Sequence, residues 1–272
     1  MISKNQIKWV RQLEHKKYRT QEGLFVAEGP KVVGDLLRAG MQPRAIFCTS
    51  EGRSSLGERL ERLRGDACGG SLRGTLSDVS SDELCRLSLL QHPQQVVGIF
   101  RIPMPPNEVR QPLHELTLAL DGVQDPGNVG TIIRLADWFG ISTVFCSPDT
   151  ADAYNPKVVQ ASMGSIAHVR IVYTPLPLLL DQLPGDYPVY GTLLDGDDIY
   201  QQALTPHGII VMGNEGNGIS PAVRERVNRR LYIPNFNTDS LSAESLNVAI
   251  ATAITCSEFR RQALPFTALR TP

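Results

Sequence analysis

Short apolar runs alternate with longer amphipathic stretches along most of the chain, and turn-forming residues separate them. The apolar runs predict strands, and stretches with apolar residues at three- and four-residue intervals predict helices. The predicted strands are 24–29, 45–50, 95–102, 116–123, 141–147, 168–173, 189–195, 208–213 and 231–236. The predicted helices are 3–22, 30–40, 57–65, 81–88, 128–140, 155–167, 175–183, one beginning near 220, and 245–262. This alternation predicts an α/β protein with a largely parallel sheet that helices cover on both faces.

The stretch from 116 to 140 carries the densest signal. An apolar strand ends in the turn-forming run Asp125-Pro126-Gly127-Asn128, and a helix follows it. Asn128 is predicted to cap this helix, and Gly140 is placed to end it. Arg134 falls early in the helix, near the carboxyl edge of the sheet, where ligands bind in open α/β sheets. The alternative is that Asn128 only caps and Arg134 only faces solvent.

Two later segments repeat the plan of strand, loop and helix. Residues 208–220, GIIVMGNEGNGIS, are a buried strand leading into a glycine-rich loop, and glycine lets a ligand approach the backbone. The spacing is neither G-x-G-x-x-G nor G-x-x-x-x-G-K-[ST], which disfavours a phosphate loop and a nicotinamide-dependent oxidoreductase. The last helix, 245–262, has an alanine-rich face against which another element can pack closely. Its members are Leu246, Ala249, Ile250, Ala253 and Ile254.

Composition favours a globular protein of two domains. A chain of 272 residues is long enough for both, and the proline-rich segment 102–112 is predicted to separate them. The predicted organisation is a first α/β domain 1–104, a linker 105–114, a second domain 115–262 and a tail 263–272. No apolar run is long enough for a membrane span and no signal-peptide core is present, so a soluble, cytoplasmic protein without membrane association is expected. Five dispersed cysteines and five dispersed histidines predict reduced thiols and no metal site.

The net charge of −1 hides an asymmetry between the two halves. Residues 1–110 hold 17 Lys and Arg against 12 Asp and Glu, whereas residues 111–272 hold 10 against 16. Six basic residues fall within the first twenty positions: Lys4, Lys8, Arg11, Lys16, Lys17 and Arg19. A basic module suits a polyanion such as nucleic acid, and the alternative is a solvated helix face.

Three segments in this order resemble the motifs of one family. DGVQDPGNVGTIIR, then VMGNEGNGIS, then IP followed by SLNVAIATAI are similar to the three motifs of the SpoU-type (TrmH-like) RNA 2'-O-ribose methyltransferases of the SPOUT class. The resemblance covers residues 115–262. The run FVAEGPKVV is similar, more weakly, to the small ribosomal-protein-like RNA-binding domain often attached to these enzymes.

The resemblance implies a fold, a cofactor and partners. The fold is a parallel α/β sheet with a C-terminal trefoil knot, an exception to the rule against threaded chains. S-adenosyl-L-methionine binds in the knot, the enzymes are usually homodimers, and the substrate is structured RNA. An attached recognition domain favours ribosomal over transfer RNA. The alternative is a catalytically inactive RNA-binding protein of the same fold.

The resemblance also implies roles for particular residues. By motif position, the cofactor residues are Thr192, Gly213, Gly218, Ile233 and Leu246. The catalytic or site-organising residues are Asn128, Arg134, Glu215, Ser245 and Asn247. Each has a simpler alternative as a turn glycine, a surface acid or a helix cap. Arg134 is a poor base in water, so it either lowers the pKa of the ribose hydroxyl, anchors a phosphate, or acts as the base. The connection 235–244 is longer than in the family, and no role is assigned to it.

Overall fold

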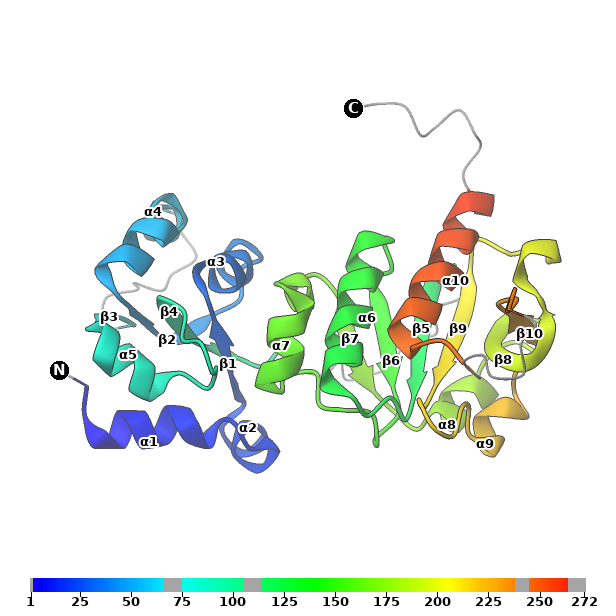
Figure 1. The fold of residues 1–272 in the computed structure, drawn as a ribbon, viewed down its shortest axis with the longest axis horizontal. Helices are drawn as coiled ribbons and strands as arrows, with labels where there is room; N and C mark the ends of the chain where they lie inside the picture. The colour runs from blue at the N-terminus through cyan, green and yellow to red at the C-terminus, as the bar shows by residue number, and fades with distance from the viewer. Residues whose placement is uncertain (1, 66–74, 105–113, 238–244, 264–272) are drawn as a thin grey trace. The chain divides into compact units, whose positions relative to one another are not determined.

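A computed structural model describes residues 2–65, 75–104, 114–237 and 245–263 (Figure 1). The chain forms two compact units. The first contains residues 1–104 together with 152–168, and the second contains 105–151 together with 169–272. The predicted linker and tail lie almost wholly outside the described residues. In the described parts of the chain, none of the helices combines the length and the apolar character that a membrane span requires.

The first unit is built on a four-stranded sheet in the order β1-β4-β2-β3. Its strands are β1 (Leu24–Glu28), β2 (Pro43–Cys48), β3 (Leu76–Asp78) and β4 (Val96–Arg101). β4 is antiparallel to both β1 and β2, and β3 is parallel to β2. The predicted strand–helix–strand unit therefore has β4 inserted between its two strands. β3 was not predicted, because three residues are too few to show an alternating pattern.

Helices cover both faces of this sheet. They are α1 (Lys4–Gln12), α2 (Lys16–Glu22), α3 (Pro30–Arg38), α4 (Ser50–Gly65) and α5 (Ser81–Leu87). The predicted helix 3–22 is two helices, since the chain turns at Leu13–His15 and His15 takes an extended conformation. Val10 and Leu13 are fully buried in one apolar cluster with residues of α5 and the sheet.

The first unit includes the segment 152–168, which the sequence placed in the second domain. It contains α7 (Pro156–Ser162) and η1 (Ser165–Ala167). Both Nε and Nη2 of Arg19 donate to Oδ2 of Asp152, at 3.0 and 2.5 Å, and Arg19 is only 2% exposed. The rings of Phe25 and Tyr154 lie 5.0 Å apart. Burial, and then Asp152, raise the pKa of Tyr154 to about 12. Arg19 is therefore a structural residue and is not available to a polyanion.

The second unit is a six-stranded sheet in the order β10-β8-β9-β5-β6-β7, and every pairing in it is parallel, as predicted. Its strands are β5 (Leu116–Asp121), β6 (Thr143–Cys146), β7 (Arg170–Tyr173), β8 (Val189–Asp198), β9 (Gly208–Gly213) and β10 (Arg229–Tyr232). All six residues of β5 are buried, and both of its neighbours are strands. β5 and β9 therefore form the centre of the sheet, and their carboxyl ends meet at one edge.

Helices cover both faces of the second sheet as well. They are α6 (Pro126–Trp138), α8 (Leu176–Asp181), η2 (Ile199–Gln201), α9 (Pro221–Arg224) and α10 (Val248–Ala263). Leu176, Leu179 and Val223 pack in one cluster with Ala119 and Val211. α6 and α10 lie side by side on the opposite face (Figure 1). Of the alanine-rich face predicted for the last helix, Ala249 is buried but Ile250 remains 53% exposed, because α10 also turns Val248, Thr252, Cys256 and Phe259 inward.

Candidate active site

The turn after β5 is fixed by a cap at Asp125. Its Oδ1 accepts the backbone N–H of Asn128 at 2.8 Å, and Pro126 occupies the first helical position. The prediction that Asn128 caps α6 is therefore wrong. Proline favours the first turn of a helix because it has no N–H to leave unpaired, so the residue before it becomes the cap. Asn128 is the third residue of α6, and its side chain is free for other contacts.

The glycine-rich loop after β9 is a tight hairpin. Asn214 and Gly218 exchange both backbone hydrogen bonds at 2.9 Å. A Cβ on Gly213 would lie 2.3 Å from the carbonyl carbon of Gly218, so only glycine fits there. Gly218 has a φ of 67°, a left-handed conformation that glycine adopts without steric cost. Oδ1 of Asn214 accepts the N–H groups of Gly216 and Asn217 at 2.9 Å each, which fixes the tip of the loop.

A chain of hydrogen bonds joins the three motif segments. Nδ2 of Asn128 donates to Oε1 of Glu215 at 2.9 Å, and Oδ1 of Asn128 accepts Nδ2 of Asn247 at 2.9 Å. Glu215 also accepts the N–H groups of Gln124 at 3.3 Å and Asp125 at 3.4 Å. The turn before α6, the glycine loop and the residues before α10 are thus held together by side-chain amides and one carboxylate.

The orientation of each amide in this chain follows from its partners. Oδ1 of Asn247 accepts the N–H groups of Ala249 at 2.9 Å and Ile250 at 3.3 Å, so Asn247 caps α10 and turns its Nδ2 toward Asn128. Asn128 must then accept with its oxygen and donate with its nitrogen. Ionised Glu215 can only accept, which suits a position faced by three donors.

The side chain of Glu215 is held in its ionised form. Partial burial raises its pKa, but the hydrogen bonds from Asn128 and from the backbone, including Gln124 and Asp125, outweigh that effect, so the pKa lies below the ordinary value of 4.5. A hydrogen bond to the charged form of an acid stabilises that form. Glu215 therefore carries a negative charge at neutral pH.

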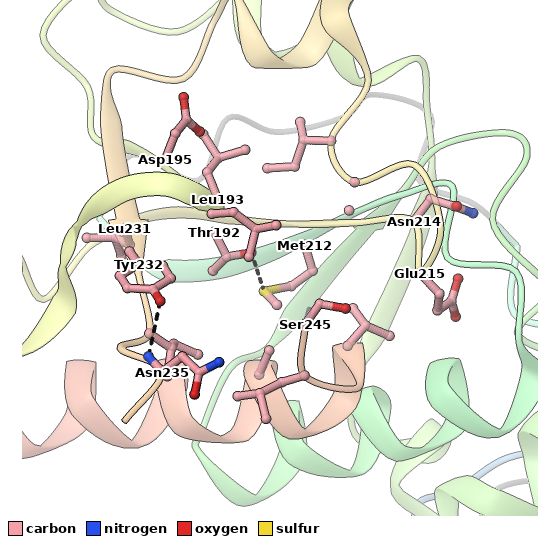
Figure 2. A pocket seen from close by; sticks show the side chains of 18 of the residues that line it. Thr192, Leu193, Asp195, Met212, Asn214, Glu215, Leu231, Tyr232, Asn235 and Ser245 are labelled. Carbon is pink, nitrogen blue, oxygen red and sulfur yellow. Dashed lines mark hydrogen bonds between the residues drawn. The ribbon is translucent and has the colours of Figure 1, made fainter. Parts of the chain in front are cut away.

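A cavity of about 970 Å³ opens beside this hydrogen-bonded chain (Figure 2). All five predicted cofactor residues line it, as do Glu215 and Ser245. The register of β10 against β8 shifts between Arg230, which pairs with Gly191, and Leu231, which pairs with Asp197. Residues 192–196 of β8 are thus left without a partner on β10, and Thr192 to Asp195 line the cavity.

The lining combines apolar and polar groups. Figure 2 shows Thr192 and Met212 side by side on β8 and β9, where the hydroxyl of Thr192 bonds the Val211 carbonyl at 3.2 Å and contacts the Met212 sulfur at 3.6 Å. The hydroxyl of Tyr232 accepts the N–H of Asn235 at 3.1 Å, which bends the chain as it leaves β10. Close backbone at Gly213 and an apolar wall suit a nucleoside that is held by main-chain groups. Among the described residues, no group of His, Cys, Asp and Glu is arranged to ligate a metal.

Arg134 is not part of this arrangement. It is exposed on the outer side of α6, eight residues after Pro126, and it is neither among the residues lining the cavity nor a member of the hydrogen-bonded chain. Thr131 and Trp138 share its side of the helix by their spacing, and Trp138 is 83% exposed.

Two functional positions escaped the sequence reasoning. Nδ2 of Asn214 donates to the Gly122 carbonyl at 2.7 Å, and Oδ2 of Asp121 accepts the N–H of Ser220 at 2.6 Å. Together they tie both ends of the glycine loop to the end of β5. The available signal was a polar residue directly at the end of each central strand, in LALDG and VMGNE.

Comparison with known proteins agrees with the motif assignment. The SpoU rRNA Methylase family model matches residues 115–257, and an MRM3-like substrate binding domain matches residues 4–98. The chain is 33% identical over 255 residues to the 23S rRNA (guanosine(2553)-2'-O)-methyltransferase RlmP of Bacillus subtilis, covering 93% of this chain and 95% of RlmP.

Solved structures of similar chains share the fold. A putative RNA methyltransferase of the TrmH family from Porphyromonas gingivalis superposes with a TM-score of 0.79 at 42% identity, covering 96% of this chain and 99% of that one. An AdoMet-bound rRNA methyltransferase from Sinorhizobium meliloti superposes with a TM-score of 0.81 at 29% identity, covering 97% of each. From its motifs, its fold and these matches, the chain belongs to the SpoU rRNA methylase family.

Proposed function

We propose that this protein transfers a methyl group from S-adenosyl-L-methionine to a ribose 2'-hydroxyl of structured RNA, with ribosomal RNA as the substrate. The observation that carries the proposal is the hydrogen-bonded chain Asn247–Asn128–Glu215, which joins all three motif segments at the edge of the cavity. Relatives of this chain include enzymes named as 23S rRNA 2'-O-methyltransferases, which favours ribosomal over transfer RNA.

The cavity fits the cofactor. Gly213 and Gly218 present bare backbone, Thr192 lies beside Met212, and Ile233 and Leu246 add apolar surface. These five residues would hold the nucleoside and the methionine portion between them. When bound, the cofactor supplies a methyl group already activated by the positive charge of a sulfonium.

The chain's own residues then have two tasks, alignment and help with the loss of the hydroxyl proton. Glu215 holds the amide of Asn128, and Asn247 fixes the other side of that amide, so Asn128 is kept in one orientation toward the ribose. Ser245 lines the cavity just before α10, which supports a role for its hydroxyl in contacting the same sugar. Arg134 supplies positive charge, which lowers the pKa of the hydroxyl or anchors an adjacent phosphate.

We place Arg134 in the site through a second copy of the chain. Its position outside its own cavity is the reason. The same face carries Trp138, and the neighbouring helix carries Ile250 at 53% and, just before it, Leu246 at 49% exposure. Apolar surface of this kind on two adjacent helices suits the self-complementary interface of a symmetric homodimer.

The C-terminal trefoil knot is also part of the proposal. The chain leaves β10 at one edge of the sheet and returns to α10, which packs against α6 and β9 nearer the centre. A threaded C-terminal segment accounts for this path. Ile233, before the connection, and Leu246, after it, line the same cavity.

The test is methyl transfer from labelled S-adenosylmethionine to 23S rRNA transcribed in vitro, with the modified position mapped by resistance to alkaline cleavage. Incorporation at a single 2'-hydroxyl is expected. A catalytically inactive RNA-binding protein would take up no label and show no heat on calorimetric titration with the cofactor. The proposal would be refuted if the protein bound the cofactor but transferred the labelled methyl group to a nucleobase and not to a 2'-hydroxyl.

A further inference from the structure

The first two helices carry exposed positive charge. Lys4, Lys8 and Arg11 recur at four- and three-residue intervals along α1, so they share one side of the helix, and all three are exposed. Their positions span about 10 Å along the axis at about 1.5 Å per residue. Lys16 and Lys17, the first two residues of α2, are also exposed. These five residues are referred to below as the basic stripe.

The charge of the basic stripe is not neutralised within the first unit. In the described part of the chain, none of the five side chains forms an ion pair with a carboxylate. Arg11 Nη1 reaches the carbonyl of Arg86 on α5 at 3.4 Å, which brings a sixth exposed cation beside the stripe. The carboxylate of Glu83 is engaged by the N–H groups of Ile2 at 2.8 Å and Ser80 at 3.0 Å. Arg19, in contrast, is buried and paired, so it does not contribute.

Geometry decides which partner this stripe fits. The apolar side of α1 is already covered, since Ile7 and Trp9 pack against the buried cluster that contains Val10 and Leu13. The helix therefore has no free apolar face to insert into a bilayer. No large apolar side chain of residues 2–22 is among the exposed ones, so the stripe also lacks the anchor that protein interfaces use.

An aromatic pair lies at the corner between the two helices. The rings of His15 and Tyr18 are 6.4 Å apart, His15 is exposed and Tyr18 is half-buried, and Lys16 and Lys17 lie between them in sequence. Aromatic and imidazole rings beside lysines are the combination that binds unpaired RNA, where bases stack on rings and ammonium groups contact phosphates.

We infer that the basic stripe of α1 and α2 is the surface by which the first unit holds the phosphate backbone of the substrate RNA, with His15 and Tyr18 beside an unpaired base. This inference rests on the proposed function, which identifies the polyanion as RNA. It assigns RNA affinity to the stripe and leaves cofactor binding and chemistry to the second unit. Each phosphate contact contributes to the salt dependence of binding, which gives the inference a quantitative test.

The experiment compares full-length variants binding to 23S rRNA transcript across a KCl series. In the stripe variant Lys4→Gln/Lys8→Gln/Arg11→Gln, the slope of log affinity against log salt should fall by about 2 to 3, with a loss of roughly 30- to 100-fold at ~0.15 M salt. The matched control, Arg44→Gln/Arg101→Gln/Lys157→Gln, removes the same charge from exposed residues of the same unit and should keep the wild-type slope. A charge-preserving variant, Lys4→Arg/Lys8→Arg/Arg11→Lys, should keep it as well.

Calorimetry with S-adenosylmethionine separates this inference from the proposed function. The stripe variant should bind the cofactor as the wild type does and should unfold at the same temperature. If the wild type methylates RNA and the stripe variant keeps the wild-type slope, the inference about the basic stripe is refuted and the proposed function stands. A slope that falls equally in the control refutes that inference too. A wild type that binds RNA through the stripe but neither binds the cofactor nor methylates overturns the function alone.

Discussion

Replacement of Gly213 by alanine tests how the glycine loop shapes the proposed cofactor cavity. The added Cβ would lie 2.3 Å from the carbonyl carbon of Gly218 and 2.4 Å from the nitrogen of Ile219, and both are backbone atoms. Ordinary contacts begin near 3.4 Å, so the facing strand of the hairpin must move by about 1 Å. That movement breaks or stretches the two 2.9 Å hydrogen bonds between Asn214 and Gly218.

The size of the effect follows from these contacts. Two net hydrogen bonds contribute about 1 kcal/mol each, and forced overpacking costs about 1 to 3 kcal/mol, so Gly213→Ala should lower stability by roughly 3 to 5 kcal/mol. Two glycines in the same loop provide a graded comparison. A Cβ on Gly216 meets only the Asn214 side-chain oxygen at 3.6 Å, so Gly216→Ala should cost about zero. Gly218→Ala meets no atom but must hold a φ of 67°, which costs about 1 kcal/mol.

The assay is urea denaturation of the three variants together with calorimetric titration of S-adenosylmethionine. Stability and cofactor affinity should both fall in the order Gly216→Ala, Gly218→Ala, Gly213→Ala. The Gly213 variant should lose at least 10-fold in affinity, since a loop shifted by about 1 Å no longer fits the ligand. If the Gly213 variant bound the cofactor as tightly as the Gly216 variant, the close approach of β9 to the loop would not shape the site.

Three further substitutions probe the other parts of the structure. Glu215→Gln should lower the free energy of unfolding by about 1 kcal/mol at neutral pH, because the charge-assisted hydrogen bonds of the exposed carboxylate are lost. In urea denaturation this difference from the wild type should vanish as the pH falls below the ordinary value of 4.5 and through the lowered pKa of Glu215. A difference that does not depend on pH would contradict the prediction. Arg19→Ala should lower the free energy of unfolding by about 3 kcal/mol, because Asp152 is left unpaired. In a double-mutant cycle, adding Asp152→Ala should restore part of that loss. Additive effects of the two substitutions would show that the pair is not coupled. Arg134→Lys should lower methyl transfer at least 10-fold without changing cofactor affinity, because lysine keeps the charge but not the planar fork, and transfer at the wild-type rate would remove Arg134 from the proposed site.

The second sheet could be predicted because its signals are local. Apolar runs such as 116–121 and 208–213 stand between turn-forming residues, and each predicted strand of this unit is present. The resemblance to the family also grouped five proposed cofactor positions, and all five line one cavity. Asn128 shows the limit of that reasoning. Its position in the motif was identified, but its hydrogen-bond partners come from segments about 90 and 120 residues away, which no local pattern reports.

The errors in the first half have the same origin. Arg19 counted as one of six basic residues in a helix, yet its partner Asp152 is 133 residues distant in sequence. The break at Leu13–His15 lies within a continuous polar stretch that contains neither glycine nor proline to mark it. The insertion of β4 between β1 and β2 depends on pairing between strands that are far apart in the chain, which the order of elements leaves open.

The inclusion of residues 152–168 in the first unit limits how the protein can be divided. The backbone passes between the units after Met104, after Ala151 and after His168, so no single cut separates them. A fragment ending at residue 104 would lack Asp152 and leave the buried guanidinium of Arg19 without its counter-ion. The complementary fragment would expose Val158 and Val159, which are at most 1% accessible in the intact chain. Recombination between relatives at the proline-rich segment would therefore exchange an incomplete domain. Hybrid enzymes should fold only when residues 1–104 and 152–168 come from the same parent.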